Sequence, residues 1–141
     1  MIRVLIAGLG NMGLSHALAH HHHPDAQIVG LVNRSGTVDH PDLAAYPVYT
    51  DFRAALAETR PDLAVIATYT DTHADYAIAA MEAGAHVFVE KPLAATVADA
   101  ARVDVHLLSH RDGFFPFEAS DIKAFARETL ESVRPHLVLT H

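Results

Sequence analysis

The run Ile2-Arg3-Val4-Leu5-Ile6-Ala7, followed at once by Gly8-Leu9-Gly10-Asn11-Met12-Gly13, decides the fold expected of this chain. The first run is short and almost wholly apolar, which is typical of a parallel strand covered by helices on both faces. The second has the spacing Gly-x-Gly-x-x-Gly, and a segment of helical composition follows it. A strand before this motif and a helix after it are the context in which the motif indicates a dinucleotide-binding site.

Each glycine of the motif has a physical task in such a site. Gly8 would permit the tight turn, Gly10 would let the backbone approach a pyrophosphate, and Gly13 would let the helix pack closely on the strand. Asn11 and Met12 lie at the start of the helix, where unpaired N–H groups and a partial positive charge favour phosphate. The alternative is a tight turn that binds nothing, but the strand–helix context favours binding.

Apolar runs alternate with helix-period stretches along most of the chain, which is the pattern of βαβ units. The sequence therefore predicts an α/β fold, with a Rossmann-like, doubly wound, mostly parallel sheet in a single three-layer domain. Further strands are expected over residues 27–32, 48–49, 62–68, 86–89, 103–108 and 137–139. Helices are expected over residues 11–22, 52–56, 72–84, 96–102 and 121–133.

Composition excludes several classes of protein. The formal net charge of −7 argues against a nucleic-acid surface, which needs clustered Lys and Arg. No apolar run approaches the roughly 20 residues that cross a bilayer, and the N-terminus lacks the pattern of a signal peptide. The chain has no cysteine, which excludes disulfides and thiolate metal sites and fits a reducing compartment. We expect a cytoplasmic protein whose partner is a small molecule.

The end of the second predicted strand bears on the choice between NAD and NADP. NAD-binding proteins commonly have an acidic residue here, which hydrogen-bonds the ribose 2′-hydroxyl. This chain has Asn33, Arg34 and Ser35 instead. No carboxylate would repel a 2′-phosphate, and Arg34 could pair with one, so the charges favour NADP. The alternative is a solvent-exposed Arg34, with Asn33 bonding the ribose of NAD.

A second motif is more specific than the glycine loop. It comprises Ala67-Thr68-Tyr69-Thr70-Asp71-Thr72-His73 and Ala83-Gly84-Ala85-His86-Val87-Phe88-Val89-Glu90-Lys91-Pro92-Leu93. Together with the N-terminal glycine loop, it resembles the Gfo/Idh/MocA oxidoreductases, which act on sugars, inositols and related polyols. The resemblance implies that Lys91 lies near the nicotinamide and the reacting carbinol, as the catalytic candidate. It also implies that Glu90 lies near the nicotinamide ribose and that Pro92 forms a tight, often cis, turn.

The resemblance places Thr68 and His73 in a loop that lines the cofactor. Tyr69 and Thr70 stand where members of the family commonly have Pro or Asn, and we include Tyr69 among the cofactor-binding candidates. The loop and Lys91 both follow predicted strands directly, at the edge where open α/β sheets bind ligands. Without the family pattern, Lys91 and its neighbours could equally be a surface salt bridge and a turn.

Residues 103–141 depart from this pattern. In the family, the helix after Glu-Lys-Pro leads into a large substrate domain, which we expect to be absent here. Residues 103–108, the run Arg111-Asp112-Gly113-Phe114-Phe115-Pro116-Phe117 and residues 135–141 instead resemble a strand–helix–strand piece of the PIG-L/LmbE-type zinc-dependent deacetylases. This resemblance implies a chimera joined near residues 101–105, in which the second piece completes the same sheet. The alternative is an unusual family member with a divergent tail.

The chain has 12 histidines, which raise the question of a metal site. His16, His20 and His23 would share one helical face, but only Asp25 offers a nearby carboxylate, so a solvated helix end is the better interpretation. His23-Pro24-Asp25 imitates part of the zinc motif of the deacetylases, yet it follows a helix rather than a strand. No metal site is expected.

We therefore expect residues 1–102 to be an NAD(P)-binding Rossmann domain that does not turn over substrate alone. A first alternative is a recombined chain that folds but binds little or no cofactor. A weaker one is a zinc hydrolase, whose ligands are absent. Apolar surface that packs on a substrate domain in the family would be covered here by residues 103–141 or by a homodimer.

Overall fold

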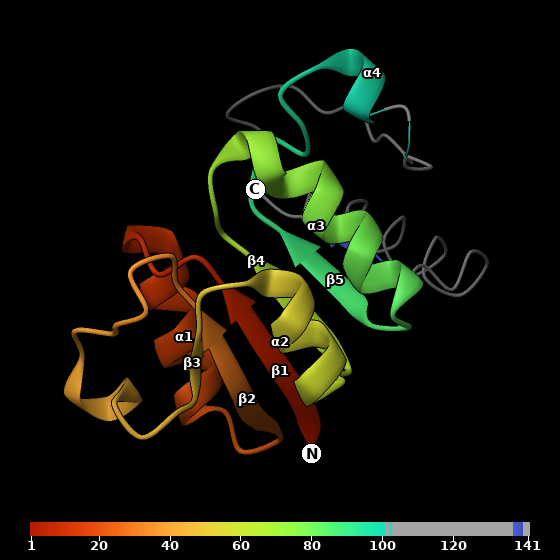
Figure 1. Ribbon diagram of the computed structural model, residues 1–141. Helices are drawn as coiled ribbons and strands as arrows, with labels where there is room; N and C mark the ends of the chain where they lie inside the picture. The colour runs from red at the N-terminus through yellow and green to blue at the C-terminus, as the bar shows by residue number, and fades with distance from the viewer. Residues whose placement is uncertain (101, 103–136, 140–141) are drawn as a thin grey trace, which may run out of the picture. The chain divides into compact units, whose positions relative to one another are not determined.

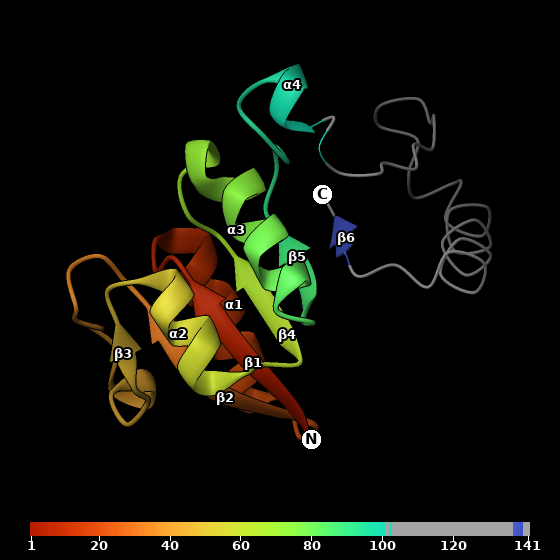
Figure 2. The same cartoon turned by 45° about the vertical axis from the view of Figure 1, so that its right-hand side comes forward.

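A parallel sheet of six strands organises the described part of the chain (Figures 1 and 2). The computed structural model describes residues 1–100, 102 and 137–139. The chain divides into one unit of residues 1–103 and 136–141, which contains everything described here, and another of residues 104–135. The strand order is β3-β2-β1-β4-β5-β6. The strands are β1 (Ile2–Ala7), β2 (Ala26–Val32), β3 (Val48–Tyr49), β4 (Leu63–Ile66), β5 (His86–Val89) and β6 (Leu137–Leu139).

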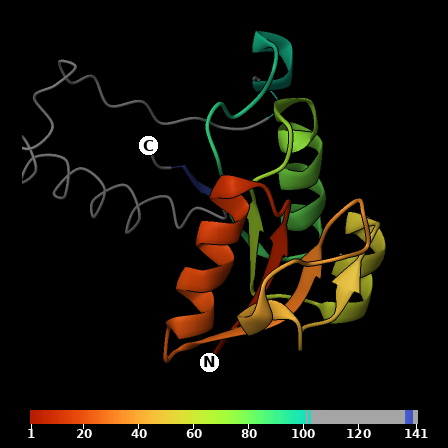
Figure 3. The ribbon, with the colours of Figure 1, turned by 90° about the vertical axis from the view of Figure 1, so that its left-hand side faces the viewer.

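Helices cover both faces of the sheet, which gives three layers (Figure 3). Helix α1 (Asn11–His22) lies on one face, and α2 (Phe52–Thr59) and α3 (Thr70–Glu82) lie on the other. The short 3₁₀ helix η1 (Pro41–Leu43) precedes β3, and α4 (Val97–Ala100) follows β5. Within the described ranges, no helix has the length and apolar character needed to span a membrane.

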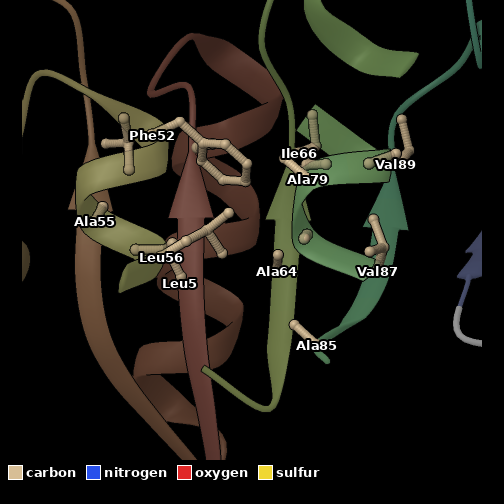
Figure 4. Close-up of a cluster of buried hydrophobic side chains, with 14 residues drawn as sticks. Leu5, Phe52, Ala55, Leu56, Ala64, Ile66, Ala79, Ala85, Val87 and Val89 are labelled. Atoms are coloured by element: carbon tan, nitrogen blue, oxygen red, sulfur yellow. The ribbon is translucent and has the colours of Figure 1, made fainter. Parts of the chain in front are cut away.

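The core consists of two apolar clusters, one on each face of the sheet, because successive side chains of a strand point to opposite faces. Val4 and Ile6 of β1 belong to the cluster that includes Ala17 of α1. Leu5 and Ala7 belong to the cluster beneath α2 and α3 (Figure 4). Both sets are completely buried, which explains why residues 4–7 of this strand form a continuous apolar run.

Most predicted elements are present, with shifted ends. The predicted N-cap of α2 is confirmed, since the Asp51 side chain accepts a hydrogen bond from the Ala54 N–H at 2.7 Å. The predicted glycine end of α3 is confirmed as well, since Gly84 has a φ of 87° just after the helix. β4 ends at Ile66 rather than at residue 68, and α3 begins at Thr70 rather than at residue 72.

The final predicted strand, over residues 137–139, is confirmed as β6, and it pairs parallel to β5. The strand predicted over residues 103–108 and the helix predicted over 121–133 lie outside the described residues. The resemblance of residues 103–141 to the deacetylases stays a prediction for the same reason.

Candidate functional site

The loops after β1, β2, β4 and β5 lie at the carboxyl edge of the sheet, where open α/β sheets bind ligands. β1 and β4 are neighbours at its centre. The chain leaves β1 toward α1 and leaves β4 toward α3, on the opposite face (Figure 3). This divergence is the topological switch point of a doubly wound fold. The residues singled out in the sequence lie in these four loops and in the helices that follow two of them.

Gly8 and Gly13 are required by the packing of the glycine loop. Gly8 has a φ of 88°, and a Cβ built on it would lie 2.4 Å from the carbonyl oxygen of Ala67. A Cβ built on Gly13 would lie 1.9 Å from the carbonyl oxygen of Gly8. Both distances are far below van der Waals contact, so the loop after β1 packs backbone against backbone, as the sequence predicts.

Gly10 differs from the other two glycines of the motif. A Cβ built on it would meet no atom within 4 Å, and its φ of −69° is open to any residue. Gly10 is exposed, so the space beside it is free on the side where α1 begins.

The start of α1 offers backbone donors beside Gly10. The Leu14 N–H donates to the Gly10 carbonyl at 2.8 Å, so the N–H groups of the three preceding residues lack partners within the helix. Gly10 caps the helix without a side-chain hydrogen bond, and the first turn contains no acidic residue. Asn11 is exposed, and Met12 has 55% of its surface exposed. Free N–H groups at the positive end of a helix dipole bind phosphate.

The turn after β2 is ordered by Asn33. Its side-chain amide donates to the Ser35 hydroxyl at 2.9 Å and to the Thr37 carbonyl at 2.6 Å. Its backbone N–H donates to the Tyr49 carbonyl of β3 at 2.9 Å. Both amide hydrogens are thus used within the protein, which leaves the side-chain oxygen of Asn33 for a ligand.

Arg34 brings this turn together with the loop after β4. Its guanidinium carbon lies 5.3 Å from the centre of the Tyr69 ring. Both side chains are exposed, Tyr69 with 71% of its surface. A cation over an aromatic face within about 6 Å is an attractive pair. The pair presents a positive charge and a flat ring at the carboxyl edge of the sheet.

The structure places Thr68 and His73 in supporting positions. The Thr68 hydroxyl hydrogen-bonds the Thr72 hydroxyl at 2.7 Å. His73 lies on α3 with only 2% of its surface exposed. Its two ring nitrogens lie 3.0 Å from the Thr68 carbonyl and 2.7 Å from the Pro92 carbonyl. His73 therefore holds the loop from inside, and its polar atoms are already occupied.

Glu90, Lys91 and Pro92 directly follow β5. The Glu90 carboxylate lies 2.7 Å from a ring nitrogen of His16 on α1, and its backbone N–H donates to the Ile66 carbonyl at 2.9 Å. Lys91 is exposed and, within the described residues, has no hydrogen bond or ion pair. The Lys91–Pro92 peptide bond is cis, which confirms the turn implied by the family resemblance.

The sequence does not predict the contact of His16 with Glu90. It suggests His16 only as one of three histidines, with His20 and His23, that share a helical face. In the structure the three rings have different partners. His20 contacts the His16 carbonyl at 2.8 Å, and His23 accepts a hydrogen bond from the Asp25 N–H at 3.1 Å. The signal that could have found His16 is its place beside Ala17 and three residues after Gly13, on the helix face that packs on the sheet.

Another group of side chains has the composition of a metal site. His21, His22 and Asp42 offer ligand atoms that lie within 4.8 Å of one another. His22 and Asp42 are exposed, and His21 also contacts the Tyr46 hydroxyl at 2.9 Å. Side chains of this kind gather on surfaces without binding a metal, so we assign no role to them.

Comparison with known proteins identifies the family. The model of the Gfo/Idh/MocA oxidoreductases, described as an oxidoreductase family with an NAD-binding Rossmann fold, matches residues 2–112. This match runs past the boundary expected at residue 102 and through the expected join. No curated protein matches the chain.

Several solved structures are similar to this chain. UDP-N-acetylglucosamine 3-dehydrogenase GnnA from Acidithiobacillus ferrooxidans is 28% identical, with a TM-score of 0.61 over 72% of this chain and 33% of its own. The WlbA dehydrogenase from Bordetella pertussis, in complex with NADH and UDP-GlcNAcA, is 26% identical, with a TM-score of 0.61 over 72% of this chain and 32% of its own. Myo-inositol 2-dehydrogenase from Lactobacillus plantarum is 26% identical, with a TM-score of 0.61 over 71% of this chain and 31% of its own.

This chain therefore spans about a third of the length of the solved relatives. The chain belongs to the Gfo/Idh/MocA oxidoreductase family, whose NAD-binding Rossmann fold it shares.

Proposed function

We propose that this chain binds a dinucleotide at the carboxyl edge of its sheet and prefers NADP(H) to NAD(H). The observation that carries binding is the open space at Gly10 beside the unpaired N–H groups of α1. A pyrophosphate needs both features, close approach of the backbone and donors directed at its oxygens. The family match supports the same conclusion.

The site residues would divide among the parts of the dinucleotide. The backbone N–H groups of residues 11–13 would hold the pyrophosphate, and residues 33–35 would hold the adenosine ribose. Thr68, Tyr69 and Glu90 would line the remainder of the cofactor, as the family resemblance implies. When bound, the nicotinamide supplies hydride exchange with a substrate carbon.

Lys91 is the residue that we propose for the chemistry itself. Its ammonium is exposed and, within the described residues, unpaired, so it is free to donate a hydrogen bond to a substrate hydroxyl. Such a bond would orient the hydroxyl and stabilise negative charge that develops on its oxygen. The similar structures include dehydrogenases named for a UDP-sugar and for an inositol. We propose a sugar or polyol as the substrate class of the whole enzyme.

Cofactor binding is the activity that we propose for the described residues. Hydride transfer needs substrate and cofactor held together in reactive geometry. The chain spans about a third of the length of its solved relatives, and the residues that we assign would hold the cofactor. A cytoplasmic location and a homodimer stay predictions from the sequence.

The preference for NADPH rests on Arg34, and Arg34→Gln tests it. A 2′-phosphate would gain a charge-assisted hydrogen bond from the guanidinium, which is typically worth about 1.5–3 kcal/mol. We expect Arg34→Gln to weaken NADPH binding by about 10- to 100-fold and to leave NADH binding within about threefold. Calorimetric titration with each nucleotide measures the change.

Arg60→Gln is the matched control for this substitution. It removes the same charge just before β4, at the amino edge of the sheet, and should leave both affinities unchanged. Equal losses for NADPH and NADH in Arg34→Gln would contradict a 2′-phosphate contact.

A further inference from the structure

Lys91 stands between two residues that are each held by a histidine from a different helix. The Glu90 carboxylate lies 2.7 Å from a ring nitrogen of His16 on α1. The Pro92 carbonyl lies 2.7 Å from a ring nitrogen of His73 on α3. Since α1 and α3 cover opposite faces of the sheet (Figure 3), the segment after β5 is tied to both helix layers.

His73 joins two loops of the carboxyl edge. Its ring contacts the Thr68 carbonyl after β4 as well as the Pro92 carbonyl after β5. Carbonyl oxygens only accept hydrogen bonds, so any hydrogen bond in these contacts is donated by the ring. With 2% of its surface exposed, the ring has no solvent to replace either partner.

His16 ties the same segment to the helix that follows the glycine loop. Its ring packs edge-on against Phe88 of β5, with centroids 4.8 Å apart and planes at 64°. The bond to Glu90 joins side chains that are 20% and 17% exposed, and a hydrogen bond accepted by a carboxylate is stronger than one between neutral groups. The helix whose first turn faces Gly10 is therefore bonded to the residue before Lys91.

Lys91 itself contributes nothing to this anchoring. Within the described residues its ammonium has no partner, and a four-carbon stem allows many conformers. Where its nitrogen can reach is set by the backbone from which the stem departs. That backbone is fixed at Glu90 by His16 and at Pro92 by His73.

We propose that His16 and His73 are positioning residues, which clamp residues 90–92 so that Lys91 is presented at the cofactor edge. The value of the clamp rests on the proposed function of Lys91, but its existence is a property of this chain alone. A buried histidine could instead serve only the general stability of the fold. The two roles differ in where the structure loosens when the ring is removed.

Backbone amide hydrogen exchange of the chain without cofactor tests the clamp. In His16→Leu and His73→Leu, we expect the Glu90 amide, which donates to Ile66, to exchange about tenfold faster than in the unmodified chain. Amides of β1 should keep their rates, because the opening is local. His16→Gln retains a donor for the Glu90 carboxylate and should restore most of the protection.

His22→Leu makes the same change at an exposed position of α1 and should have no effect at Glu90. Unchanged exchange at Glu90 in a folded His16→Leu chain would overturn the proposal. So would an equal rise at every amide, which would indicate general destabilisation. If His73→Leu does not fold, the comparison of His16→Leu with His16→Gln still decides.

Cofactor titration of the same variants separates this proposal from the proposed function. A chain that binds no dinucleotide but shows the local exchange change would refute the function and retain the clamp. If the chain binds NADPH but hydrogen exchange at Glu90 is unchanged in every variant, the proposed function is retained and the clamp is refuted.

Discussion

Gly13→Ala is expected to lower the free energy of unfolding of this domain by about 3 kcal/mol, near the upper end of the usual cost of overpacking. The added methyl carbon would lie 1.9 Å from the Gly8 carbonyl oxygen and 2.8 Å from its carbon. Both atoms belong to the backbone, so no side chain can rotate away to relieve the contact. The loop after β1 would have to move off α1, as chemical denaturation followed by circular dichroism would show.

Gly10→Ala is the control for this substitution, because it adds the same methyl group three residues earlier. It meets no atom within 4 Å, and the backbone there is in an ordinary conformation. Replacing a glycine at such a position changes stability little, or raises it by about 0.4–1 kcal/mol. A Gly13→Ala chain as stable as Gly10→Ala would mean that α1 does not pack on the loop after β1 as closely as described.

Gly10→Val is expected to abolish dinucleotide binding without unfolding the domain. The side chain would extend into the open space beside the first turn of α1, and the space that it fills is the one proposed for the pyrophosphate. We expect the affinity for NADPH to fall by about 100-fold or more, equivalent to about 2.7 kcal/mol. Calorimetric titration gives the affinity, and thermal unfolding shows that the fold is retained.

Ala19→Val is a matched control, since it adds bulk at an exposed position of the same helix. It should leave the affinity for NADPH unchanged. Binding by Gly10→Val equal to that of Ala19→Val would place the pyrophosphate elsewhere.

The fold could be predicted from the sequence because its deciding features are local. A strand buried on both faces shows as an apolar run, as residues 4–7 of β1 do. The capping of α2 by Asp51 and the end of α3 before Gly84 depend on neighbours within a few residues. Apolar runs, N-cap residues and glycines at helix ends can therefore be recognised without knowing how the rest of the chain packs.

The contacts of the site could not be predicted in this way. Arg34 and Tyr69 lie in different loops, and only the pairing of the strands brings them together. His16 and Glu90 are 74 residues apart in the sequence, and nothing near either residue indicates the other. The sequence suggested Asn33 as a ribose ligand, but it could not show that its amide hydrogens are used within the turn.

The resemblance implied contacts for the site residues that depend on packing. His73 illustrates the difference. It was expected to line the cofactor, and the structure buries it between two carbonyls. His73 contacts the loop after β4 through Thr68 and the segment after β5 through Pro92. The pattern of residue types alone does not reveal these two contacts.

Titration of the unmodified chain with NADPH, followed by calorimetry beside the Gly10→Val chain, tests the central claim most directly. We predict saturable binding of one dinucleotide per chain by the unmodified protein, and its loss in Gly10→Val. Absence of binding by the unmodified protein to both NADPH and NADH at millimolar concentration, which corresponds to a binding free energy weaker than about −4 kcal/mol, would contradict it.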